Sequence, residues 1–177
     1  MLRLSGGFGV ARVSHPASSE GQPEREYRDV SMMLEVSLGG SVARNWLLHG
    51  TVTGFELRQP RVYEDGIDVG RPRRTLRVAS LGTGLTRYLG PSNVYLHGGL
   101  GVGFVRLTGG EDSSWRSNPG LVLLAALGKE WWVGRGRWGL GCALRGEVVR
   151  VSAEVEEGIS TPVQALLLGL AFSATLD

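Results

Sequence analysis

Apolar and polar residues alternate along most of this chain, in segments separated by polar stretches. The segment 94–107 shows the pattern clearly. One set of alternate positions carries the apolar residues Val94, Leu96, Gly98, Leu100, Val102 and Phe104. The other set is Tyr95, His97, Gly99, Gly101, Gly103 and Val105. A period of two residues indicates a β-strand whose two faces meet different surroundings.

Two further segments repeat this alternation with charges on the polar face. In 30–42 the apolar set is Val30, Met32, Leu34, Val36, Leu38 and Val42, against Ser31, Glu35, Ser37, Gly39 and Ser41. In 138–152 it is Leu140, Cys142, Leu144 and Val148, against Gly139, Gly141, Arg145 and Glu147. The segments 119–133 and 162–176 are apolar on both faces and fit a buried strand equally well. The prediction that one face meets lipid therefore depends on the segments 30–42, 94–107 and 138–152.

Eight segments are predicted as strands, each longer than the roughly 9 to 11 residues that cross a bilayer at a tilt. They are Leu2–Ser14, Val30–Val42, Leu47–Leu57, Thr75–Leu89, Val94–Leu107, Pro119–Val133, Trp138–Ser152 and Pro162–Leu176. The connections alternate between long and short. The long ones are His15–Asp29, Arg58–Arg74, Thr108–Asn118 and Ala153–Thr161, and the short ones are Ala43–Trp46, Gly90–Asn93 and Gly134–Arg137. This pattern predicts an all-β fold, an eight-stranded antiparallel up-and-down transmembrane barrel with short periplasmic turns and four longer external loops. One domain covers residues 1–177.

Six aromatic residues lie beside the short turns. They are Trp46, Tyr88, Tyr95, Trp131, Trp132 and Trp138. Indole and phenol rings favour the membrane–water interface, because each has an apolar body and a polar tip. If the three turns share one rim, these rings are expected to form one aromatic belt around it.

The composition restricts how the chain could enter a membrane. It has 177 residues, of which 42% are hydrophobic and 20% charged. Its long apolar runs, such as Leu121–Leu127, are far shorter than the roughly 20 residues of a spanning helix. Only a closed barrel would then satisfy the backbone in lipid. The 28 glycines, without a collagen period, fit strands that approach one another closely.

Charge and cysteine content narrow the function further. A net charge of +2 is too small to indicate nucleic-acid binding, and the lone Cys142 excludes an internal disulfide. It is expected to act as a small hydrophobic residue. The N-terminus passes directly into strand-like alternation. Export to a bacterial outer membrane requires a signal peptide, which we take to have been removed.

Residues 82–103 (GTGLTRYLGPSNVYLHGGLGVG), followed by 127–133 (LGKEWWV), resemble small bacterial outer-membrane β-barrel proteins, particularly myxobacterial forms. The likeness covers mainly residues 80 to 140. It implies an eight-stranded barrel and a role among the structural, adhesive, passive-transport and lipid-modifying activities of that group. The C-terminal strand departs from the common pattern, because Phe172 is followed by five further residues instead of ending the chain.

Catalytic and cofactor motifs are weak. Residues 134–139 match the dinucleotide pattern GxGxxG, but no helix is predicted after them to hold a pyrophosphate, so a glycine-rich hairpin turn is the better interpretation. His49 and His97 are expected near the short-turn rim, far from the outer leaflet, and His15 opens the first long loop. We interpret the histidines as lumen-lining or interface residues. No catalytic residue, metal site or cofactor is predicted.

Four charged residues are predicted to face the barrel interior: Glu35, Glu130, Arg145 and Glu147. An unpaired charge in so narrow a space would be costly, and an eight-stranded interior holds side chains, not a wide channel. We therefore expect Arg145 to bridge one or more of the glutamates and plug the lumen. The pairs would then either hold the barrel shut or gate a narrow conduit.

Arginines cluster around the second long loop. Because guanidinium groups bind phosphates bidentately, Arg71, Arg73, Arg74 and Arg77 are candidate contacts for lipopolysaccharide phosphates, with solvated loop charge as the alternative. The leading functional hypothesis is a monomeric outer-membrane barrel with a structural or surface-interaction role, whose external loops carry any binding. The alternatives are a narrow passive transporter for small hydrophobic molecules and a soluble barrel that binds a ligand inside.

Overall fold

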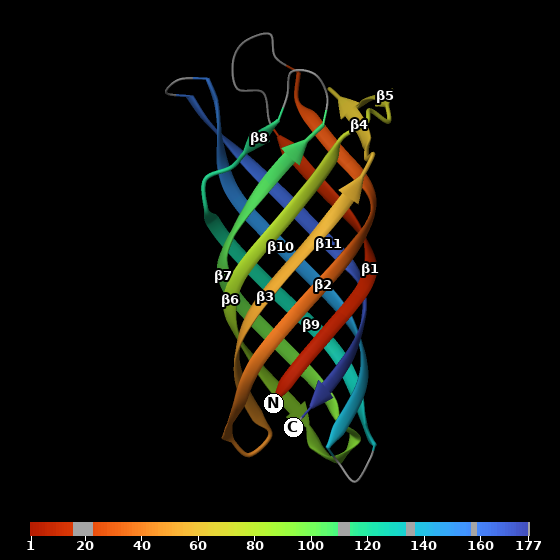
Figure 1. Cartoon of the computed structure of the whole chain (residues 1–177), viewed down its shortest axis with the longest axis vertical. Helices are drawn as coiled ribbons and strands as arrows, with labels where there is room; N and C mark the ends of the chain where they lie inside the picture. The colour runs from red at the N-terminus through yellow and green to blue at the C-terminus, as the bar shows by residue number, and fades with distance from the viewer. Residues whose placement is uncertain (16–22, 110–113, 134–136, 157–158, 177) are drawn as a thin grey trace.

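A computed structural model describes residues 1–15, 23–109, 114–133, 137–156 and 159–176. Eight long antiparallel strands form a closed ring, as predicted (Figure 1). They are β1 (Leu2–His15), β2 (Arg25–Ala43), β3 (Trp46–Arg58), β6 (Thr75–Leu89), β7 (Val94–Thr108), β9 (Gly120–Val133), β10 (Trp138–Glu156) and β11 (Ile159–Leu176). The first and last strands close the ring, because β1 pairs with β11 over thirteen residues, from Leu2↔Leu176 to Ser14↔Gln164.

The two ends of the barrel differ, and we call them the turn end and the loop end. At the turn end lie the termini, the tight turn closed by Asn45 at a φ of 65°, and the single-turn helix η1 (Gly90–Ser92). The third predicted short turn falls largely on residues 134–136, outside the described part of the chain. The first three residues of the GxGxxG pattern, 134–136, also lie outside the described residues.

The long connections contain more strand than the sequence pattern predicted. The stretch 58–74 includes a small hairpin, β4 (Arg61–Glu64) and β5 (Ile67–Gly70), and β4 pairs with β2. The predicted first loop is shorter, because β2 begins at Arg25 instead of Val30. A two-residue strand, β8 (Trp115–Arg116), pairs with β7 in the third. The predicted fourth loop, 153–161, is wrong: β10 and β11 continue as a ladder to Glu156 and Ile159.

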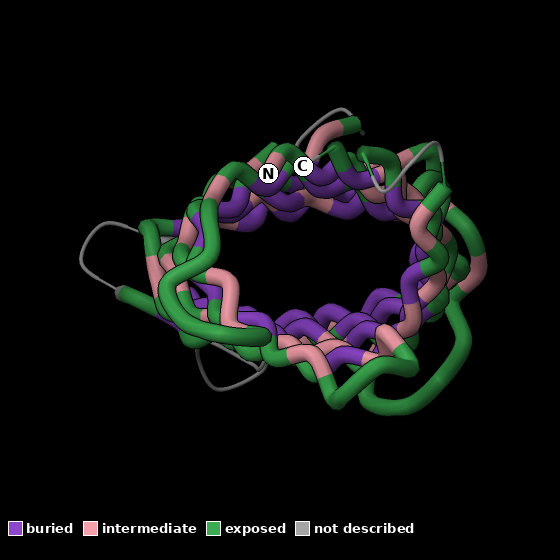
Figure 2. Tube along the Cα trace, turned by 90° about the horizontal axis from the view of Figure 1, so that it is seen from below, coloured by how far each residue is buried: buried purple, intermediate pink, exposed green. Residues whose placement is uncertain are grey.

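Alternation sorts the side chains into an outer and an inner set, as the sequence predicted. On β2, Leu34 and Leu38 are each 68% exposed on the outer face, whereas the intervening Glu35 and Ser37 are buried inside. On β7, Leu100 faces outward and Tyr95 inward. Seen along the barrel, buried positions line the inside of the wall in Figure 2 and exposed ones its outside. The exposed apolar side chains form a continuous outer band, which is the surface a barrel presents to lipid.

Glycine is required where the curved wall brings strands together. Gly82 on β6 and Gly101 on β7 are register partners on the inner face. A Cβ on either would lie 2.4 Å from a carbonyl oxygen, that of Leu100 or Leu81 respectively. The close approach of strands that the glycine content indicated is present at this pair.

If the outer band meets lipid, a charge introduced there lowers the free energy of unfolding, by more in the middle of the bilayer than at its edge. We expect Leu100→Arg, in the middle of the outward face of β7, to lower the free energy of unfolding by about 2–4 kcal/mol, and Leu89→Arg, at the turn end, by about 0–1 kcal/mol. Denaturant unfolding in phospholipid vesicles measures both. Equal small losses at the two positions would show that the wall does not meet hydrocarbon.

Candidate functional site

The most distinctive interior feature is a buried ion cluster around Arg145 of β10. Arg145 donates from Nη1 to Glu35 of β2, and from Nη2 to Glu147 Oε2 at 2.8 Å and Thr53 Oγ1 at 2.6 Å. Glu35 and Glu147 also accept hydroxyl hydrogen bonds from Ser37 and Ser80, respectively. All three ionic side chains are nearly or fully buried. The cluster ties β10 to strands on the opposite side of the ring, across the lumen.

A second ion cluster lies nearer the turn end. Glu130 of β9 was one of the glutamates that Arg145 could have bridged. It pairs instead with Arg3 of β1 at 2.7 Å. Glu130 also accepts from Tyr88 and from Thr175 Oγ1, and Arg3 lies 5.0 Å from the centre of the Tyr95 ring. Sequence reasoning missed Arg3. Arg3 shares its set of alternate positions with Ser5 and Gly7, and this polar set was the signal that its side chain faces the lumen.

Histidines extend the polar network on one side of the lumen. His49 and His97 stack with ring centroids 4.9 Å apart. Thr86 Oγ1 lies between them, 3.0 Å from His49 Nε2 and 3.1 Å from His97 Nδ1. Thr51 continues the chain of contacts from His49 towards Ser37 and the Arg145 cluster. These two histidines line the lumen in its turn-end half, while His15 ends β1 at the loop end, where its ring lies 5.7 Å from Trp115.

Towards the loop end the interior changes from polar to apolar. Above the Arg145 cluster most inward residues are aliphatic or aromatic, and many are completely buried; Ser31 of β2 and Thr161 of β11 are buried polar exceptions. The packed set includes Val13, Tyr27, Phe55, Leu57, Leu76, Val105, Leu107, Val149, Val163 and Leu167. Such a core resembles that of a soluble protein. It explains why the segments 119–133 and 162–176 are apolar on both faces.

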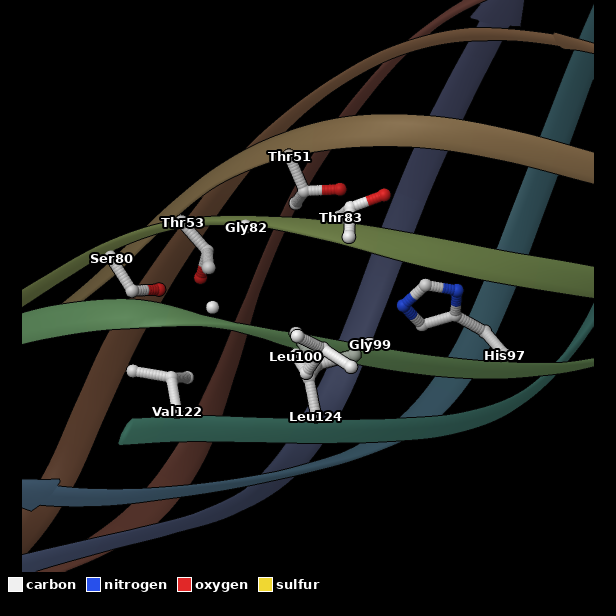
Figure 3. Close-up of a pocket in the computed structure, with 11 residues that line it drawn as sticks. Thr51, Thr53, Ser80, Gly82, Thr83, His97, Gly99, Leu100, Val122 and Leu124 are labelled. Carbon is white, nitrogen blue, oxygen red and sulfur yellow. The ribbon is translucent and has the colours of Figure 1, made fainter. Parts of the chain in front are cut away.

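The cavities between these layers are small. One, shown in Figure 3, lies where Thr51, Thr53, Ser80 and His97 meet Val122 and Leu124, at the border of the polar and apolar layers, with a volume of about 20 Å³. Another of about 20 Å³ lies among Arg3, Glu35, His97 and Arg145. Each has room for about one water molecule.

Of the six residues predicted to form an aromatic belt, three lie on the outer face of the wall, where the belt stays a prediction, and three do not. Trp131 and Trp138 are half exposed on the outer wall, and Trp46 lies under Arg87 on the same outer face. Tyr88 and Tyr95 instead point into the lumen, where they contact Arg3 and Glu130. Trp132 follows the inward set of β9, beside Gly139. The alternation of the strands, not the distance from a turn, decides which rings face lipid.

The four arginines predicted to contact phosphate lie at the loop end but differ in surroundings. Arg71 pairs with Asp29 at 2.5 Å, and Arg77 pairs with Glu56 at 2.6 Å. Arg73 and Arg74 lie in the stretch between β5 and β6. Phosphate contact by these residues stays a prediction.

The sequence matches no protein-family model and no curated protein, but the fold has solved counterparts. Neisserial surface protein A superposes with a TM-score of 0.56 at 13% identity, over 97% of this chain and 95% of that one. The outer membrane protein AlkL superposes with a TM-score of 0.52 at 18% identity, over 99% and 90%. The fold is that of a small outer-membrane β-barrel protein. The soluble-barrel alternative required a polar exterior, whereas the band around the middle of this wall is apolar.

The Arg145 cluster generates a stability prediction. Arg145→Ala leaves the Glu35 and Glu147 carboxylates buried without their cation, and we expect it to lower the free energy of unfolding by about 3–5 kcal/mol. Denaturant unfolding in vesicles measures the loss. In a matched variant, Arg145→Met with Glu35→Gln and Glu147→Gln, most of that loss should be recovered, because no charge remains unpaired. Wild-type stability for Arg145→Ala alone would contradict the assignment.

Proposed function

We propose that this protein is an integral barrel of the bacterial outer membrane, closed to ions and solutes, which anchors a set of external loops that carry its interactions. The observation that supports this proposal is the filled lumen. The Arg145 cluster and the apolar core close it in succession, so a passing ion would have to break a salt-bridge network and then cross a dry layer. Either step is costly in a low-dielectric interior.

The loop end supplies a surface for interaction. The hairpin of β4 and β5 extends from the barrel rim (Figure 1), and β5 pairs only with β4 among the described strands. Ile67 and Val69 on β5 are 70% and 51% exposed. An unpaired strand edge with exposed apolar side chains favours pairing with another chain. A surface-interaction role is thus better supported than a purely structural one.

Transport of small hydrophobic molecules is the second candidate, and the apolar half of the lumen is the feature that favours it. That half is packed, however, because Leu57, Leu76 and Leu107 are almost entirely buried within one hydrophobic cluster. A molecule larger than water would have to displace this core. No residue of the described chain supports an enzymatic alternative strongly enough to propose it.

The closed-lumen proposal predicts an absence of conductance with a specific way to restore it. In planar lipid bilayers the wild-type barrel should show no ion-conducting steps. Removing the charged layer alone, with Glu35→Ala, Arg145→Ala and Glu147→Ala, should leave the barrel closed, because the apolar core remains. Adding Leu57→Ala and Leu107→Ala to that variant should produce steps.

Heat-dependent gel mobility, which separates folded from unfolded barrels, serves as the control that each variant has inserted. Clear steps from the folded wild-type protein would refute the proposal. So would opening by the charge variant alone, since it would show that the apolar core does not seal the lumen.

A further inference from the structure

A row of arginines crosses the outer wall at the loop end. Glu56 of β3, Arg77 of β6, Arg106 of β7 and Arg116 of β8 are register partners in succession. The three arginines are exposed. Like charges directly opposite one another on a sheet destabilise it, so three adjacent arginines indicate that something anionic compensates them.

The carboxylates of the described chain compensate this row only in part. Glu56 accepts from Arg77 Nε at 2.6 Å but is shared with Arg58, whose Nε lies 2.5 Å away. Arg106 makes no ion pair with any described residue. Arg12 of β1 and Arg28 of β2 are also register partners, but a carboxylate compensates them, because both pair with Glu26. Of these two sets of cross-strand arginines, only the one on β6, β7 and β8 keeps an excess of positive charge.

A groove lies directly beneath and beside the arginine row. In the next outward row towards the turn end, small residues occupy two adjacent strands, Gly54 of β3 and Ala79 of β6, between Leu34 and Phe104. One outward row lower, Val52 and Leu81 are large again and form a ledge. The resulting groove has a volume of about 510 Å³ and an apolar floor. Its rim carries the arginines Arg58, Arg71 and Arg77 and the carboxylates of Asp29 and Glu56.

We propose that this groove and the arginine row bind a phosphorylated, acylated lipid of the outer leaflet, of the lipid A type. A phosphate would lie on Arg77 and Arg106, and an acyl chain would lie over Gly54 and Ala79. The inference rests on the proposed position in the outer membrane. Guanidinium groups bind phosphate oxygens bidentately, and the trough left by two small side chains is filled by hydrocarbon in preference to water.

The position of the row favours a lipid over a soluble polyanion. On the outward face of β7, Arg106 follows Val102 and Phe104, which belong to the apolar outer band. The Arg116 guanidinium lies 4.6 Å from the centre of the Phe104 ring. The cationic groups thus lie at the boundary of the hydrocarbon, at the depth of lipid phosphates. A soluble ligand would meet them only from the side facing water.

This site modifies the phosphate contacts expected from sequence. Arg71 and Arg77 line the groove, whereas Arg73 and Arg74 do not, and Arg106 and Arg116 were not predicted. The sequence-based prediction grouped arginines by their closeness to the second long loop. The site instead depends on register across β3, β6, β7 and β8, which joins residues far apart in the chain.

Native mass spectrometry of the folded protein, released from detergent micelles, tests the proposal with bisphosphorylated lipid A and the same lipid without phosphates. The phosphorylated form should bind at least tenfold more tightly. Arg106→Gln should weaken its binding about tenfold, the loss of a charge-assisted contact, and leave the dephosphorylated form unaffected. Ala79→Leu, which fills the groove, should weaken both forms.

Matched variants elsewhere on the wall serve as controls. Arg87→Gln removes an outward arginine at the turn end of β6, and Ala125→Leu enlarges an outward residue of β9; both should bind like wild type. Equal affinity for the two lipid forms, or unchanged binding by Arg106→Gln, would overturn the proposal. A soluble sulfated oligosaccharide that binds through Arg106 but is insensitive to Ala79→Leu would also overturn it, in favour of a soluble polyanion. These outcomes are independent of conductance, so a closed barrel could pass one test and fail the other.

Discussion

The closure of the hydrogen-bonded ring is the constraint on which the rest of the structure depends. Hydrocarbon offers no partner for a peptide group, so each spanning strand must bond to a neighbour on both sides. The pairing of β1 with β11 removes the last two edges. A ring of eight strands is narrow, and every second residue must therefore enter a small interior. The composition of that interior, and of the wall outside it, follows from this geometry.

The interior is filled by two chemistries in sequence along the barrel axis. Near the turn end, buried charges are tolerated because each is paired: Arg3 with Glu130, and Arg145 with Glu35 and Glu147. Near the loop end, aliphatic residues pack as in a soluble core. The two layers have different consequences. The ion clusters join strands that face one another across the lumen, and the apolar layer lies between those clusters and the loop end.

The strands and their faces could be predicted from sequence because a period of two residues is local information. All eight spanning strands were expected, and the bounds of β6, Thr75–Leu89, are those expected. The pairing of Glu130 with Arg3 could not be predicted, since it joins residues 127 positions apart through the register of a closed ring. The inward turn of Tyr88 and Tyr95 was missed for a different reason: closeness to a turn was given more weight than alternation. The arginine row on the outer wall likewise appears only once four strands are set in register.

The outer wall has three regions with different side chains. Its middle is apolar, its turn end carries Trp46, Trp131 and Trp138, and its loop end carries arginines above a groove. The most direct test of the account is the environment of that wall. Nitroxide labels at Leu100 and Leu144 in lipid vesicles should be accessible to dissolved oxygen and shielded from a water-soluble nickel reagent. Free access of the nickel reagent to both labels would contradict a barrel whose outside is wetted by lipid.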